Sequence, residues 1–427
     1  MSQRPSDVRV LEANRTQLEW RSYDLESTLP EDHEARLVWS ALGRLDLSRF
    51  YEGIAAREAR PGRPPNDPRV TLCLWIYATS QGVGSARELE MLCSRDDAYR
   101  WILGGLSVNH HSLSDFRNQH GDAVDGLMTE LLGVLMHQGL ITLKRVAQDG
   151  MRVRASAGAA SFRRESTLKK SLAEARVQVA TLRQAIEHEP AAHTARQRAA
   201  KQRAVEEREQ SLERALAQMP AVKTAKKRSR RRGKKKVSPA RVSTTDPEAR
   251  VMKMADGGYR PAYNVQLATD TDARFIVGVD VSNVGSDMGL MIPMLEQLGK
   301  RLGKLPAEHL VDGGFAAKEG IDFAASHGVT VFAPVKKPAK KRRRGSPPRR
   351  RDSNAVRAWR ARMKTEAAKE LYKQRASTAE TVNADLRCWR GLDRFRVRGM
   401  PKVLAVIRLA AFTHNLRRWL KLERPAS

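Results

Sequence analysis

The stretch Ile141-Thr142-Leu143-Lys144-Arg145-Val146-Ala147-Gln148-Asp149-Gly150 decides the fold. β-Branched and aliphatic residues dominate its first part, which predicts a strand over residues 141–147 that ends at the last three residues. Residues 263–268 predict a second strand, and residues 275–281 a third that is nearly all apolar and therefore buried on both faces. Thr269-Asp270-Thr271-Asp272 joins these two strands and suits a hairpin. These strands predict the first part of a sheet.

After the third strand, the pattern changes to alternating helices and strands. Apolar residues at helical spacing predict a helix around residues 291–298, and a second helix spans residues 316–326. His309-Leu310-Val311-Asp312 predicts a fourth strand that ends at Gly313-Gly314, and residues 329–333 predict a fifth. The whole pattern predicts an α/β fold with a mixed five-stranded sheet flanked by helices.

Residues 30–140, which precede the sheet, are predicted to be helical. Ser85-Ala86-Arg87-Glu88 has the spacing of a capping box, and Ser112-Leu113-Ser114-Asp115 repeats it. Apolar residues from Val124 to Leu135 also keep helical spacing. This region is compatible with a helix-turn-helix, although helical packing alone is the more common explanation of such a pattern.

A heptad seam interrupts the predicted sheet. Its members are Leu168, Leu172, Ala175, Val179, Leu182 and Ile186. The steps of four and three predict a helix of nearly three heptads that Pro190 ends, and a second, polar helix follows over residues 194–218. The pattern is equally compatible with packing against that second helix and with pairing to a second subunit. C-terminal to the sheet, residues 355–387 and 403–420 are also predicted to be helical.

Positive charge is concentrated in two internal tracts. The 427-residue chain has 78 Lys and Arg against 48 Asp and Glu, a net charge of +30. Residues 223–241 contain 11 basic residues in 19, and residues 336–351 contain 10 in 16, with no acid in either. Removing these 21 charges leaves 30 − 21 = +9 for the rest. Such tracts indicate contacts with nucleic-acid phosphates in preference to two solvated loops, because they lie inside the chain rather than at a tail.

Composition excludes several other classes of protein. An apolar fraction of 41% predicts a folded chain, and no apolar run approaches the 18 residues of a transmembrane helix. Residues 1–19 are polar and carry acids, which predicts neither a signal nor a transit peptide. Three cysteines without pairing or zinc-like spacing fit a reducing cytosol. With 5% aromatic residues and no stacking motif, RNA binding is disfavoured.

Two aspartates are the strongest chemical candidates. Asp149 and Asp312 each follow an apolar stretch and precede a glycine. A single Asp-Gly pair is more often a tight turn than a ligand. Two hard carboxylates from neighbouring strands, joined by a third from a facing helix, would instead make an oxygen-ligand site for Mg²⁺ or Mn²⁺. The ten histidines have no metal-binding spacing, and the chain lacks a P-loop, a dinucleotide fingerprint and a nucleophile elbow.

Several blocks in shared order resemble bacterial insertion-sequence transposases of the DDE type, over about residues 40–420. The blocks are Gly62-Arg63-Pro64-Pro65 to Glu90, Tyr99 to Gly105, His111 to Arg117, Asp149-Gly150-Met151, Asp246 to Arg250, Tyr263-Asn264-Val265-Gln266, Leu310-Val311-Asp312-Gly313-Gly314-Phe315, the helix with Tyr372, Arg375, Glu380 and Arg387, Arg398-Gly399, and His414-Asn415-Leu416. Each block is weak alone, and their order makes the resemblance specific. The resemblance implies a ribonuclease-H-like catalytic core.

The resemblance also implies the site. It places Asp149, Asp312 and Glu380 at the catalytic and metal-binding positions, with two Mg²⁺ or Mn²⁺ ions. Asp287, which follows the third strand, is the alternative to Asp312. The chain departs from the family pattern in two ways: Arg387 stands where related groups carry Lys, and the gap from Arg375 to Glu380 is one residue longer.

The residues expected to bind DNA come from the helix around Glu380 and from the basic tracts. They are Tyr372, Arg375, Arg387, Arg228, Arg231, Lys235, Arg342, Arg343 and Arg350. The implied partners are double-stranded DNA, as element ends and as target, and further copies of the chain in a homodimer or larger assembly, with no membrane. The implied location is the bacterial cytoplasm, at the nucleoid.

The implied function is that of a transposase that binds the terminal inverted repeats of an insertion sequence. Water attacks the strand at the element's end, and the freed 3′-OH then attacks target DNA. The alternative is a catalytically retired transposase that only binds or represses DNA.

The predicted domains follow from these boundaries. They are a helical N-terminal DNA-binding domain (1–140), a catalytic core in two parts (141–164 and 245–335), a helical, coiled-coil-like insertion (165–222), a basic linker (223–244), a basic disordered loop (336–352), and C-terminal helices that carry the third carboxylate (353–427).

Overall fold

The fold is described from a computed structural model. The structure describes residues 24–54, 64–188, 195–231, 238–335 and 352–423, together with residues 16 and 18.

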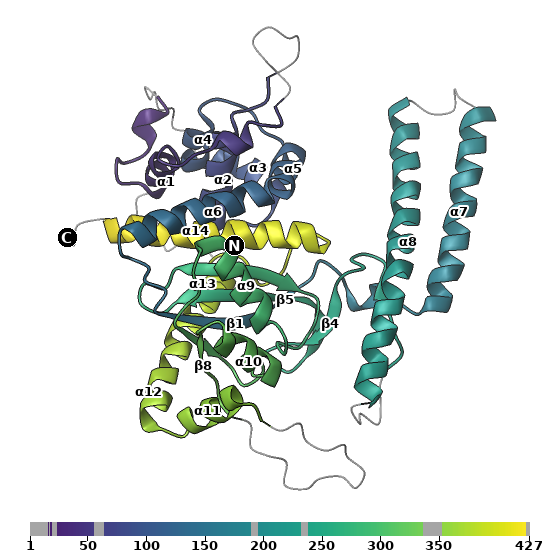
Figure 1. Cartoon of the computed structure of the whole chain (residues 1–427). Helices are drawn as coiled ribbons and strands as arrows, with labels where there is room; N and C mark the ends of the chain where they lie inside the picture. Colours follow the sequence, from purple (N-terminus) through teal and green to yellow (C-terminus); the bar gives the residue numbers. More distant parts are fainter. Residues whose placement is uncertain are drawn as a thin grey trace, which may run out of the picture.

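A mixed sheet of six strands forms the centre of the molecule (Figure 1). Its strands are β1 (Arg145–Arg154), β4 (Arg250–Lys253), β5 (Tyr259–Asp270), β6 (Ile276–Ser282), β7 (Glu308–Val311) and β8 (Thr330–Phe332). β5 pairs antiparallel with β1, β4 and β6, whereas β7 is parallel to both β1 and β8. The order β6-β5-β1-β7-β8 confirms the predicted ribonuclease-H-like sheet of five strands. β4 is an additional short strand, on the same edge of β5 as β6.

The first strand lies further along the chain than predicted. The predicted strand over residues 141–147 was to end at Gln148-Asp149-Gly150, but β1 runs from Arg145 to Arg154 and pairs with β5 continuously from Val146 to Arg154. Leu143 has a positive φ of 55°, which breaks the extended backbone before β1. The long partner strand β5 therefore outweighs the low strand propensity of Asp and Gly.

Helices cover both faces of the sheet on its β7–β8 side. α9 (Met291–Leu302), α10 (Lys318–Ser326) and α11 (Asn354–Arg362) share a core with Val311 and Val331. On the other face, α12 (Glu366–Arg375) and the π-helical turn η4 (Ala376–Glu380) pack against Ala147 and Leu310. α13 (Thr381–Cys388) follows directly. The helix predicted over residues 355–387 is therefore three helices and one π turn.

The N-terminal region is helical, as predicted. Its elements are η1 (Glu26–Thr28), α1 (Glu34–Leu42), η2 (Ser48–Phe50), α2 (Pro68–Ser80), α3 (Ala86–Arg95), α4 (Asp97–Leu103), α5 (His110–Gln119) and α6 (Gly121–His137). α14 (Met400–Glu423) lies between these helices and the sheet (Figure 1). The Asn415 amide bonds both backbone groups of Ile276 in β6, at 2.8 and 2.7 Å. One hydrophobic core therefore joins the helical region to the sheet.

The insertion is a helical hairpin, α7 (Glu165–His188) and α8 (Ala195–Arg231), that projects to the side of the molecule (Figure 1). At its base, η3 (Ala159–Ser161) leads into β2 (Phe162–Arg163), which pairs with β3 (Val242–Ser243). Leu168, Leu172 and Ala175 of the seam pack against Leu212 and Met219 of α8. This part of the seam therefore packs within the chain, as one of the two alternatives predicted.

α8 is longer than the sequence predicted. It continues past residue 218 to Arg231, with Pro220 inside it, so the first basic tract begins in a helix. Residues 232–237 of that tract, the whole tract 336–351 and Pro190 lie outside the described residues.

Candidate active site

Asp149 and Asp312 lie next to each other on adjacent strands. In the parallel pair β1–β7, Gln148 is opposite Val311. Asp149 and Asp312 are the next residues along the two segments and therefore lie side by side. Their side chains follow the alternation set by Ala147 and Leu310, which face α12 and η4. The Gly314 backbone N–H donates to Oδ1 of Asp312 and holds this carboxylate at the end of β7. The parallel register therefore brings together two acids that are 163 residues apart in the sequence.

Arg375 connects Asp149 to Glu380. Its Nη2 donates to Asp149 Oδ1 at 2.7 Å, and its Nη1 lies 3.4 Å from Glu380 Oε1. The second oxygen of Asp149 accepts from Asn383 Nδ2 at 3.0 Å. The guanidinium therefore supplies the positive charge between the first and third predicted carboxylates.

The π turn explains how the longer gap between Arg375 and Glu380 is accommodated. Each residue of an α-helix rotates the chain by about 100°, so residues five apart would face about 140° away from each other. Residues 376–380 instead form a π-helical turn, whose bonds join residue i to i+5. This wider turn absorbs one extra residue, so Arg375 and Glu380 both face Asp149 or its partners. Single π turns inside α-helices are frequent at functional sites.

The electrostatics of the site depend on burial and on these charges. Burial raises the pKa of Asp149, and the neighbouring Asp312 raises it further, whereas Arg375 opposes both effects. Burial acts to lower the pKa of Arg375, but its anionic neighbours, with Asp149 foremost, raise it overall. The pKa of Tyr372 is raised by burial first, and its hydroxyl also senses Arg375 and the three carboxylates. Tyr372 therefore borders the same site.

Asp287 lies on the opposite face of the sheet from Asp149. A Cβ on Gly150 would stand 2.5 Å from Asp287 Oδ1, and Gly150 faces away from Asp149 on the same strand. The Asp287 carboxylate accepts from Asn264 at 2.7 Å and from Gln266 at 3.0 Å. It is therefore Asp312, and not Asp287, that lies beside Asp149.

Comparison with known families gives two matches. The family model described as "Transposase DDE domain" matches residues 222–416, and the one described as "Transposase domain (DUF772)" matches residues 23–119. The chain belongs to the insertion-sequence DDE transposases. The DDE match contains Asp312 and Glu380 but begins after Asp149, within α8. No curated protein and no solved structure matches the transposase significantly.

The acids of the transposase fit a hard divalent cation in their chemistry. DDE transposases generally use such ions, and carboxylate oxygens are the ligands that Mg²⁺ prefers. Within the described ranges, no three His, Cys, Asp or Glu side chains are arranged to hold a metal ion. Beside Asp149 the positive charge is supplied by the Arg375 guanidinium.

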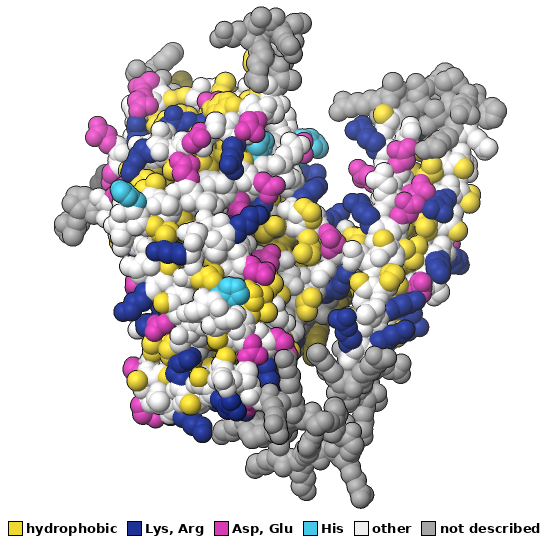
Figure 2. Space-filling model, in the orientation of Figure 1, with side chains coloured by type: hydrophobic (Ala, Val, Ile, Leu, Met, Phe, Trp, Pro, Cys, Tyr) yellow, Lys and Arg dark blue, Asp and Glu magenta, His cyan; other side chains and the backbone are white. Residues whose placement is uncertain are grey.

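The predicted DNA-binding residues of the transposase fall into three groups. Tyr372 and Arg375 are at the site itself, and Arg375 is mostly buried in its ion pair. Arg387 on α13 and Arg228 on α8 are exposed, and Figure 2 shows Lys and Arg side chains gathered on the lower part of the hairpin. Arg231 ends α8, with its side chain among those not described. Lys235, Arg342, Arg343 and Arg350 lie outside the described residues.

Sequence reasoning missed Asn383. This residue follows Glu380 by three positions, and such a spacing places two side chains on one face of a helix. That spacing was the available signal, although it does not show that the amide bonds to Asp149. Elsewhere in the transposase, no described helix has the length and apolar composition needed to cross a membrane.

Proposed function

We propose that this transposase binds the terminal inverted repeats of its insertion sequence, cleaves DNA there and joins the freed end to a target. The observation that supports this most directly is the placement of Asp149 and Asp312 side by side, with Glu380 presented from a facing helical turn. Three oxygen-donor side chains from two strands and one helix are what metal-assisted phosphoryl transfer requires. The exposed basic residues of α8 and α13 support a DNA substrate.

Asp149 would hold two ions, and Asp312 and Glu380 would each hold one. Two bound Mg²⁺ or Mn²⁺ ions supply activation of the attacking oxygen and stabilisation of the leaving oxygen. The chain's own residues orient the acids: the amide of Asn383 holds one oxygen of Asp149, and the Gly314 N–H holds Asp312. When Arg375 leaves Asp149, its fork of donors becomes available for a phosphate. Arg387, exposed about two helical turns beyond Glu380 by sequence, would contact DNA phosphates.

The N-terminal helices would read the terminal repeats, and two DNA ends would be brought together by a homodimer or larger assembly. The protein would act in the bacterial cytoplasm, at the nucleoid. A retired transposase that only binds DNA is the competing proposal, and it predicts binding without cleavage.

The test is a cleavage assay with duplex DNA that carries an end of the element. Purified protein is incubated with labelled end DNA and Mg²⁺, with EDTA and with a scrambled end as controls. We expect nicking at the end only with Mg²⁺, and joined products when a plasmid target is added. Tight and end-specific binding without any cleavage would support the retired transposase instead.

A further inference from the structure

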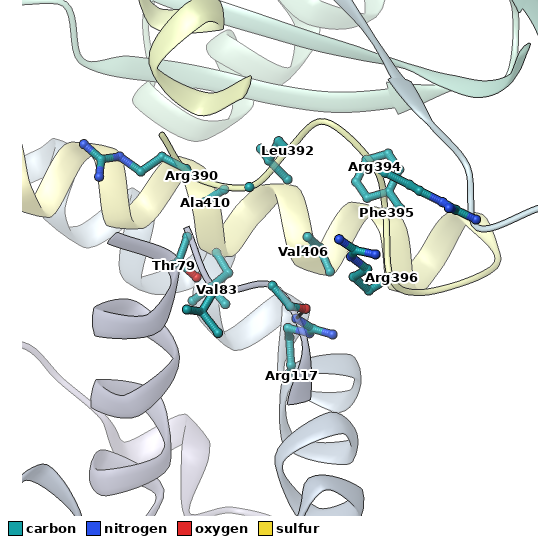
Figure 3. A pocket seen from close by; sticks show the side chains of 13 residues that line it. Thr79, Val83, Arg117, Arg390, Leu392, Arg394, Phe395, Arg396, Val406 and Ala410 are labelled. Carbon is teal, nitrogen blue, oxygen red and sulfur yellow. Dashed lines mark hydrogen bonds between the residues drawn. The ribbon is translucent and has the colours of Figure 1, made fainter. Parts of the chain in front are cut away.

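A pocket away from the candidate active site lies where the N-terminal helices meet the segment after α13 (Figure 3). The enclosed cavity is small, about 20 Å³, and the larger volume of about 410 Å³ around it includes space that is open to solvent. Arg117 of α5 lies on one side, residues 390–396 lie on the other, and Val406 and Ala410 of α14 form an apolar wall. We call this site the Arg117 pocket.

Arg117 is a buried cation without an acid beside it. The residue is 7% exposed, and within the described part of the chain it pairs with no carboxylate. Its Nη1 donates to the Gly84 carbonyl at 2.9 Å, its guanidinium stacks at 4.0 Å on Trp75, and its Nε–H has no acceptor. Burial lowers the pKa of Arg117 to about 10, so the side chain still carries its charge at neutral pH. A buried charge without a counter-ion is costly.

The facing segment adds two more arginines. Arg394 and Arg396 are exposed, whereas Phe395 between them is buried, so the alternation of an extended chain turns both arginines outward. No acid among the described residues forms an ion pair with either. Arg390, by contrast, pairs with Asp385 at 3.1 Å and is already neutralised. The free positive charge of the pocket therefore belongs to Arg117, Arg394 and Arg396.

The pocket is held in place by close backbone packing. Gly82 and Gly391 both have positive φ, and a Cβ on Gly391 would stand 2.4 Å from the Gly82 carbonyl oxygen. Only glycine allows this approach without strain. The contact fixes the segment of Arg396 against the turn that follows α2. The arginines are thus presented by two elements in a defined arrangement.

We propose that the Arg117 pocket binds a phosphate group and that, in the working transposase, this phosphate belongs to the DNA backbone. Arginine clusters with free donors are matched by phosphate oxygens. The backbone of Arg394 bridges Arg154, which is five residues beyond Asp149 on β1 and thus about 17 Å away along the strand. That distance corresponds to about five nucleotides of one B-form strand. The DNA part of this inference rests on the proposed function.

The test uses DNA binding in EDTA, so that cleavage plays no part. The variants are Arg117→Met, Arg396→Gln and their combination, with Arg398→Gln as a matched control that is exposed on the same segment but does not line the pocket. We measure the affinity for duplex DNA at several salt concentrations. The log–log salt dependence should become less steep by about 1 for each single variant and about 2 for the double variant. An unchanged slope, or an equal change in Arg398→Gln, overturns the proposal.

Thermal unfolding separates a ligand site from a structural one. Without ligand, Arg117→Met should unfold at the same or a higher temperature than wild type, because it removes an uncompensated buried charge. Inorganic phosphate should raise the unfolding temperature of wild type but not of Arg117→Met. A large fall in that temperature together with a normal salt slope would make Arg117 structural and overturn the proposal. Arg396 is exposed, so Arg396→Gln should fold normally. A changed salt slope in this variant would therefore not result from misfolding.

The same data distinguish the source of the phosphate and keep this inference apart from the proposed function. Phosphate stabilisation that depends on Arg117, with DNA salt slopes unchanged, would mean a free anion and overturn the DNA assignment. If wild type does not cleave but the pocket variants lose salt dependence as expected, only the proposed function is refuted. If wild type cleaves but the pocket variants keep the wild-type salt slope, only the pocket proposal is refuted.

Discussion

The guanidinium of Arg375 donates to the carboxylate of Asp149 across 2.7 Å, from a helix on one side of the site to the central strand on the other. The two side chains are only 11% and 18% exposed. A charge-assisted bond of this kind stabilises both groups in a site of low dielectric. A metal ion held by Asp149 through the same oxygen would compete with Arg375. In the proposed reaction, binding of such an ion would therefore be coupled to release of the arginine.

The first prediction concerns the acids themselves. Asp149→Asn and Glu380→Gln should reduce strand cleavage by about 10³-fold or more while DNA binding persists, because an amide is a poor ligand for a hard cation. Asp312→Asn should behave in the same way. Asp287→Asn is the matched control on the opposite face of the sheet and should cleave close to the wild-type rate. Wild-type cleavage by any of the first three variants would remove that residue from the site.

The second prediction concerns the competition between Arg375 and metal. In EDTA, Arg375→Gln should lose about 2–4 kcal/mol of unfolding free energy, because it leaves the buried Asp149 with Asn383 as its main partner. Added Mg²⁺ or Mn²⁺ should then raise the unfolding temperature of the variant more than that of wild type. Arg387→Gln, exposed on α13, is the control and should show the wild-type response. A smaller metal response in Arg375→Gln would contradict the competition.

The third prediction concerns the π turn. Deleting Ser377, which is exposed within the turn, should convert it to an α-helical turn and keep Glu380 beside Arg375. We expect the unfolding temperature to stay within about 4 °C of wild type and cleavage to persist.

The matched control for the third prediction is deletion of Ala384, which is exposed in the regular helix α13. It should rotate the buried Leu386 by about 100° out of its core and cost about 2–5 kcal/mol. Equal loss of stability in both deletions would show that the turn does not absorb a residue.

The fourth prediction concerns Asp270, whose pKa is raised to about 6, chiefly by burial. A raised carboxyl pKa favours the folded state at low pH, and this contribution is lost as pH rises from about 4 through about 6. Asp270→Asn keeps an oxygen that can accept from the N–H groups of Asp272 and Ala273. Its stability relative to wild type should therefore increase by about 2–3 kcal/mol between pH 4 and pH 7.5.

Urea unfolding at the two pH values measures this difference. Asp272→Asn, an exposed neighbour in the same hairpin, is the control and should show little change between them. A constant difference between Asp270→Asn and wild type would mean that burial does not perturb Asp270.

The fifth prediction concerns the basic tract 336–351. Replacing it with a Gly-Ser linker of the same 16 residues removes ten positive charges. Binding to all DNA sequences should weaken about equally, and the log–log salt slope should fall by about 3 to 6, because some of the charges will face solvent. Preference for element ends should survive, since phosphate contacts carry little sequence information. An unchanged slope would show that the tract does not contact DNA.

Local hydrophobic patterns in the sequence were sufficient to predict most of the helices and strands. The strands over residues 263–268 and 275–281 and the helices after them were predicted because apolar periodicity is visible in short windows. The position of β1 was not predicted correctly, because its extent depends on pairing with β5, which is more than 100 residues away in the sequence. The π turn was also missed, although the extra residue between Arg375 and Glu380 was its signature in the sequence.

The sequence by itself determined the family, the α/β class and the three acids proposed for catalysis, because motifs in a fixed order can be recognised along the chain. Only the tertiary structure decided which side chains meet. The parallel register of β1 and β7 places Asp312 beside Asp149, and the alternation of β1 turns Gly150, with Asp287 against it, to the other face. The ion pair between Arg375 and Asp149 and the burial of Arg117 without a neighbouring acid also result from tertiary packing. Strand register and burial are set by contacts between distant segments, and a linear pattern does not encode those distances.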